Sequence, residues 1–175
     1  IVVGAASVGW RRPQGAPFPV HEPADTVAAA MRLRAAWNLG GEPVPNLAEF
    51  LEERGIKIIP LEFGENVSGL MCKAQGAKGG DVPVIVVNKD DTGERQRFTL
   101  AHELGHLVLD APSGAKGEKL AHWFAGAFLM PAETLWQEVG KHRSELSIGE
   151  LFELKALLKV SVQAITYRLK DLQII

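Results

Sequence analysis

The sequence predicts an α+β fold, because three short candidate strands lie close together near the middle of the chain and helical patterns follow them. The strand candidates are residues 56–59, 67–72 and 83–88, and each is rich in β-branched or apolar side chains. From Asp91 onward, apolar residues recur with helical spacing almost to the end. Runs of strands followed by runs of helices are typical of α+β domains. A chain of 175 residues is long enough for one such domain.

The composition is that of a folded globular protein. Hydrophobic residues make up 46% of the chain and charged residues 23%, and the formal net charge of −2 offers no footprint for nucleic acid or an anionic membrane. The longest apolar runs fall far short of the ~20 residues that a bilayer-spanning helix needs. The single cysteine, Cys72, excludes an internal disulfide and fits a reducing compartment. We therefore expect a cytoplasmic protein with neither nucleic acid nor membrane as a direct partner.

The first 24 residues are predicted to form an irregular arm or linker ahead of a domain over residues 25–175. Prolines and glycines interrupt the arm, and no periodicity lasts there. The next apolar pattern predicts a helix over 24–39 that ends at two glycines. A shorter helix over 47–54 begins behind Asn46, a residue type that commonly caps helices, and stops at Gly55.

The three strand candidates differ in how they end. Residues 56–59 are β-branched at three positions, and this strand is expected to stop at Pro60, which cannot donate a hydrogen bond to a ladder. Glycines separate candidates 67–72 and 83–88, as a loose hairpin requires. Strand 67–72 is also a candidate to pair with an extended peptide, since backbone pairing positions a peptide without demanding much sequence.

The segment that carries chemistry is an H-E-x-x-H motif formed by His102, Glu103 and His106. Its helix is expected to begin at a capping box of Asp91 and Glu94. Two histidines four residues apart project from one face of a helix, so both imidazoles can bind one cation. Zinc suits neutral imidazole ligands. The adjacent Glu103 is placed to take a proton from a metal-bound water rather than to bind the metal.

A third ligand is expected, because a catalytic zinc usually has three protein ligands and one open position. The next apolar helix carries two candidates, Glu118 and His122, which are four residues apart and share a face. The spacing favours Glu118 and leaves His122 open. The simpler interpretation of Glu118 is a solvated acid at a helix start, where the helix dipole favours it. Gly105 is a poor helix former, and its place in the motif predicts the close approach of another backbone.

These residues resemble the ImmA/IrrE family of metallopeptidases over about residues 25–175. The H-E-x-x-H motif alone is shared by many peptidases, and its combination with the Phe-Ala and Leu-Met-Pro block of the next helix is much more specific. The matching positions lie before and within the motif helix, in the next helix and in the last two helices: Asn88, residues 95–106, Glu118, Ala121, residues 124–125, 129–131, 160–165 and 168–169.

The resemblance implies a zincin-like (thermolysin-like) active-site helix beside a small, mostly antiparallel three-stranded sheet, with helices around them. It implies zinc held by His102, His106 and Glu118, with Glu103 as general base. It further implies an endopeptidase that cleaves a helix-turn-helix transcriptional repressor in a stress or mobile-element response. The chain departs from the family at His122, where Asn or Asp is usual, and the linker between the two metal-bearing helices is short.

A further donor is expected for the oxyanion that develops during hydrolysis. Tyr167 and His142 are the candidates, although packing within the last helix is the simpler expectation for Tyr167.

Two alternatives come from other classes of protein. Residues 154–172 hold two short helical patterns, as in a DNA-binding helix-turn-helix, but residues 147–175 carry four basic and three acidic side chains. That balance is too even for a phosphate-binding face. The second alternative is a protein-binding module with a non-catalytic zinc, against which the intact Glu103 argues.

Overall fold

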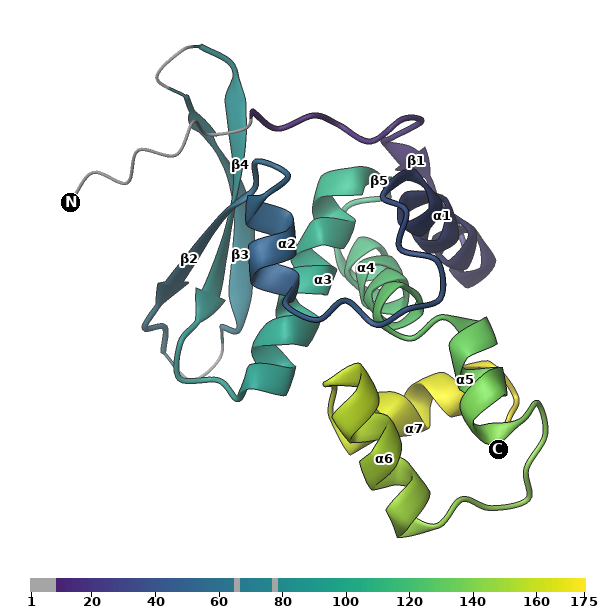
Figure 1. Ribbon diagram of the computed structural model, residues 1–175. Coiled ribbons are helices and arrows are strands. Elements are labelled where there is room, and N and C mark those ends of the chain that lie inside the picture. Colours follow the sequence, from purple (N-terminus) through teal and green to yellow (C-terminus); the bar gives the residue numbers. More distant parts are fainter. Residues whose placement is uncertain (1–8, 65–66, 77–78) are drawn as a thin grey trace.

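The computed structural model describes residues 9–64, 67–76 and 79–175. This part of the chain has a mixed α+β architecture with seven helices and two small sheets, which agrees with the predicted α+β class. In Figure 1 the three-stranded sheet forms one layer, α3 lies against it, and α4 lies between α3 and α1. The elements in chain order are β1 (Phe18–Pro19), α1 (Pro23–Ala36), α2 (Leu47–Glu52), β2 (Lys57–Leu61), β3 (Gly69–Gln75), β4 (Asp81–Asn88), α3 (Gly93–Val108), β5 (Leu109–Asp110), α4 (Ala115–Leu129), α5 (Ala132–Val139), α6 (Ile148–Leu158) and α7 (Val162–Asp171).

The three-stranded sheet has the order β2-β4-β3. β4 pairs antiparallel with β3 but parallel with β2, so the expectation of a mostly antiparallel sheet is wrong and the sheet is mixed. The apolar run Val84–Val87 is buried throughout, and a strand buried on both faces belongs in the middle of a sheet. The chain reverses its direction between β2 and β3, and reverses it again between β3 and β4. A β4 inserted between the other two strands must therefore run parallel to β2.

β2 is an edge strand, and that position explains how it accommodates Pro60. The strand continues through Pro60 to Leu61, contrary to the prediction that it stops at the proline. Proline is tolerated on edge strands, because the side that lacks an N–H can face away from the partner.

The N-terminal stretch packs onto the core at a second, two-residue sheet. β1 pairs in parallel with β5, and the side chains of Phe18 and Val20 are buried. Residues 1–8 lie outside the described part of the chain. α1 ends three residues earlier than predicted, because Asn38 already adopts a left-handed conformation with φ of 54°.

Helix α3, which carries the H-E-x-x-H motif, begins one residue later than predicted. Thr92 is the N-cap, and its hydroxyl accepts a hydrogen bond from the Arg95 N–H. The predicted capping box of Asp91 and Glu94 is therefore wrong, and the Asp91 carboxylate instead forms an ion pair with Arg95 at 3.2 Å. At α2 the predicted cap is confirmed, since the Asn46 side chain accepts from the Glu49 N–H.

The crossing of α3 and α4 explains why Gly105 interrupts the motif helix. A Cβ atom at this position would lie 3.4 Å from Ala121 Cα and 3.1 Å from the Phe124 ring. The predicted approach of another backbone is confirmed, and that backbone belongs to α4. The two metal-motif helices are thus packed at close range.

The last two helices, α6 and α7, are joined by a three-residue turn that begins at Lys159 in a left-handed conformation. This arrangement matches the pair of short helices predicted from the sequence. Within the described residues, no helix combines the length and the apolar character needed to cross a bilayer.

Candidate metal centre and active site

Three side chains from α3 and α4 converge on one point. Within the described residues, His102, His106 and Glu118 form a group whose potential ligand atoms all lie within 4.8 Å of one another. His102 Nε2 lies 3.2 Å from His106 Nε2 and 3.1 Å from Glu118 Oε2, and His106 Nε2 lies 3.3 Å from Glu118 Oε1. The histidines come from adjacent turns of α3, and Glu118 comes from the first turn of α4.

These separations suit a tetrahedral metal ion. Ligands that bind zinc at about 2.0–2.1 Å with tetrahedral angles lie about 3.3 Å from each other. The three measured separations fall close to that value, although they involve both oxygens of Glu118. The donor set of two imidazole nitrogens and one carboxylate is also one that catalytic zinc sites use. The residues present therefore fit a metal ion.

His122, the other candidate for a third ligand, lies one turn further along α4 and outside this group. Its ring packs against Phe98, with the ring centroids 4.8 Å apart, and its centroid is 6.3 Å from that of His102. The structure thus brings Glu118, and not His122, to the two motif histidines.

The protonation states favour metal binding. Burial, followed by the neighbouring His106, lowers the pKa of His102, so the neutral imidazole that a metal needs is favoured. Burial opposes ionisation of Glu118, but the two imidazoles outweigh it and hold the pKa of Glu118 below its ordinary value. The two shifts thus favour the neutral imidazole of His102 and the ionised carboxylate of Glu118, the forms that a metal ion binds.

Glu103 is the buried member of the motif. Its exposed fraction is 8%, and burial raises the pKa of its carboxyl above the ordinary value. It lines a hollow of about 510 Å³, the strand-side hollow, which it shares with His106, Glu118 and the β3 residues Gly69–Met71. A carboxylate with a raised pKa beside a cluster of metal-binding type is suited to accept a proton.

Sequence reasoning missed the role of Gly69, which lets β3 lie directly against α3. A Cβ at this position would collide with Thr99 Cγ2 and lie 2.8 Å from Val86 O. The signal was present, because an isolated glycine inside a strand often marks the close approach of another backbone.

We predict that Gly69→Ala lowers the free energy of unfolding by about 1–3 kcal/mol, because the added methyl group overpacks the contact between β3 and α3. Urea denaturation measures the effect. Gly93→Ala is the matched control, since a Cβ there would meet nothing within 4 Å. Equal stability of the two variants would contradict the contact.

A second hollow, the helix-side hollow, lies beside His102 and also measures about 510 Å³. It is lined by His122 and by Tyr167 from α7. Tyr167 is 60% exposed, so the expectation that it packs within the last helix is wrong. His142, in the segment between α5 and α6, is not among the residues that line either hollow.

A helix-borne pair of imidazoles, a carboxylate from the following helix and a buried glutamate beside them define a site of the metallopeptidase type. The chain belongs to the peptidase family of the IrrE N-terminal-like domain, whose sequence profile matches residues 51–170. This confirms the ImmA/IrrE resemblance. The matched family model is that of a peptidase domain, and the group of His102, His106 and Glu118 could hold a metal ion.

The chain is similar to one protein in sequence and to another in structure. It is 30% identical over 132 residues to the radiation response metalloprotease IrrE of Deinococcus deserti, covering 67% of this chain and 45% of that protein. A Mycobacterium tuberculosis transcriptional regulator has a similar fold, with a TM-score of 0.58 at 19% identity, over 83% of this chain and 46% of that one. The chain thus spans less than half the length of either protein.

Proposed function

We propose that residues 25–175 form a zinc-dependent endopeptidase domain in which His102, His106 and Glu118 hold the metal and Glu103 is the general base. The observation that carries the proposal is the convergence of three ligand-type side chains, at separations typical of zinc ligands, beside a buried carboxylate. The H-E-x-x-H arrangement on α3 and the metallopeptidase relatives support the same conclusion.

The proposed chemistry divides the work between the ion and Glu103. Zinc, when bound, supplies Lewis acidity toward a water molecule and the scissile carbonyl. Glu103 takes the proton of the attacking water and later delivers a proton to the leaving amine. Burial raises the pKa of Glu103, which makes its carboxylate a stronger base than an exposed one. Tyr167, exposed in the hollow beside His102, is the better placed of the two candidate oxyanion donors.

The strand-side hollow supports an extended peptide as substrate. β3 is an edge strand, with a strand partner on only one side within the described residues. Its residues Gly69–Met71 line the same hollow as Glu103 and His106, so a peptide that pairs with this edge would pass the metal cluster. On the basis of the resemblance to the ImmA/IrrE family, we propose that the substrate is a helix-turn-helix repressor. Such a substrate would place the reaction in the cytoplasm.

The test is cleavage of a candidate repressor by the metal-free protein, before and after addition of zinc. We expect defined fragments only when zinc is present, because the proposed chemistry needs the metal. Addition of a chelator before the substrate should prevent cleavage. Mass spectrometry of the products identifies the cleaved bond. Zinc-loaded protein that binds the repressor and leaves it intact would instead support a binding module with a non-catalytic zinc.

A further inference from the structure

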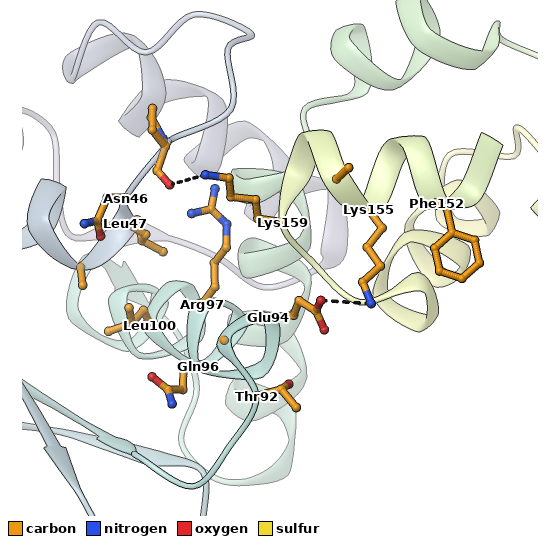
Figure 2. Close-up of a pocket in the computed structure, with 14 residues that line it drawn as sticks. Asn46, Leu47, Thr92, Glu94, Gln96, Arg97, Leu100, Phe152, Lys155 and Lys159 are labelled. Atoms are coloured by element: carbon orange, nitrogen blue, oxygen red, sulfur yellow. Dashed lines mark hydrogen bonds and ion pairs between the residues drawn. The ribbon is translucent and has the colours of Figure 1, made fainter. Parts of the chain in front are cut away.

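A cavity of about 970 Å³ lies between the starts of α2 and α3 and the helix α6. We call it the basic cavity. Figure 2 shows Lys155 and Lys159 extending from α6 toward the other two helices, and Arg97 extending from α3. Apolar side chains complete the lining, with Leu47 and Leu100 on one side and Phe152 on α6. None of its lining residues belongs to the metal cluster.

The charges in the basic cavity do not balance. Of its fourteen lining residues, three are basic and one, Glu94, is acidic. Lys155 forms an ion pair with Glu94 at 3.1 Å. Among the described residues, Lys159 Nζ donates only to a neutral acceptor, the carbonyl of Pro45, at 3.4 Å. Two positive charges, on Arg97 and Lys159, therefore remain without a carboxylate partner among the lining residues.

Arg97 is the most unusual of these groups, because it is 93% buried, with an exposed fraction of 7%. Its Nη2 donates to the Val44 carbonyl, but its Nε has no partner within the described residues. Burial lowers the pKa of Arg97, and burial, followed by the positive charge of Arg97, lowers the pKa of Arg34 to about 10. A buried cation without an anion is costly, so an anionic ligand has a clear electrostatic role here.

The N-terminus of α3 adds hydrogen-bond donors to the same cavity. The Thr92 hydroxyl satisfies the Arg95 N–H. The amides of Gly93 and Glu94, in the first turn, have no partner within the helix, and both residues line the cavity. The positive end of a 16-residue helix favours an anion at this place.

We propose that the basic cavity binds a small ligand that carries a phosphate group on an apolar or aromatic body. The phosphate would pair with Arg97 and Lys159 and accept from the first amides of α3. A dianion matches the two uncompensated positive charges better than a monoanion does. The body would lie mainly against Phe152, which is 57% exposed, because Leu47 and Leu100 are almost fully buried in the cavity wall. The volume is in the range of small-molecule sites.

Calorimetric titration of the whole chain with four probes tests the ligand chemistry: inorganic phosphate, phenyl phosphate, benzoate and phenol. We expect phenyl phosphate to bind most tightly, inorganic phosphate more weakly, and phenol not at all. Tighter binding of benzoate than of phenyl phosphate would overturn the assignment of a phosphate. Absence of heat with phenyl phosphate at millimolar concentration would overturn the site.

Two further measurements place the ligand. Lys159→Gln should weaken phenyl phosphate binding about tenfold, through loss of one charged donor, while Lys57→Gln on the exposed face of β2 leaves it unchanged. Because Lys159 is exposed, we expect its variant to keep the fold, and thermal unfolding checks this. In ¹⁵N-resolved NMR spectra the amide resonances of Gly93 and Glu94 should shift on titration. Equal affinity of the two lysine variants, or unshifted Gly93 and Glu94 resonances, would overturn the proposal.

Discussion

Replacement of Glu103 by glutamine is expected to reduce peptide cleavage by about 10²–10⁴-fold, the usual contribution of a positioned acid–base group. Glutamine has nearly the same shape but cannot accept the proton of the attacking water. Glu103 is not one of the three clustered ligand residues, so the variant should still bind one metal ion per chain. Cleavage rates and metal content, measured on the same preparation, check both parts of the prediction. A variant that cleaves at the parent rate would show that another group is the base.

The stability of the metal-free Glu103→Gln variant shows whether a loss of cleavage comes from the missing base or from misfolding. Burial raises the pKa of Glu103 in the folded state. The stabilising contribution of protonated Glu103 is fully present at pH values below its pKa in the unfolded state. This contribution is lost as the pH rises through the pKa of Glu103 in the folded state. Glutamine does not ionise, so the metal-free variant should be more stable than the metal-free parent at neutral pH. The difference should shrink as the pH is lowered, and thermal unfolding at several pH values measures it.

The second large effect is expected at the metal ligands. His102→Ala and Glu118→Ala should each weaken zinc binding by more than about 100-fold, because each removes one of three donors that lie 3.1–3.3 Å apart. His122→Ala is the matched control, since His122 occupies the same helix as Glu118 but lies outside the cluster. Equilibrium dialysis against a zinc buffer, followed by elemental analysis, gives the affinities. Loss of zinc in the His122 variant with retention in the Glu118 variant would reverse the assignment of the third ligand.

Several features encoded within a few residues were predictable from the sequence, although the local predictions of a capping box at Asp91 and of a strand end at Pro60 are wrong. The motif histidines share a face because helical spacing requires it, and Asn46 caps α2 because its side chain reaches an amide three residues away. Gly105 likewise indicated a close helix crossing, because glycine destabilises a helix interior and its presence there is explained by a close contact.

Features that depend on distant parts of the chain were not predictable in the same way. The continuous apolar run in β4 is a local sign of a central strand, but it does not show which strands pair with β4 or in which direction, because that depends on pairing between distant segments. Glu118 and His122 share a face of α4, so the choice between them depends on how α4 is rotated against α3. The exposure of Tyr167 likewise depends on where α7 packs.

The contact at Gly105 bears on the affinity of the proposed site for a metal ion. Two of the clustered donors come from α3 and the third comes from α4, so the distance between the helix axes sets the size of the cage into which an ion must fit. Gly105 and Ala121 set that distance, one turn or less from the donors. The absence of a side chain at Gly105 thus contributes to the separation of the three donors, and the proposed metal ion would have to fit that separation.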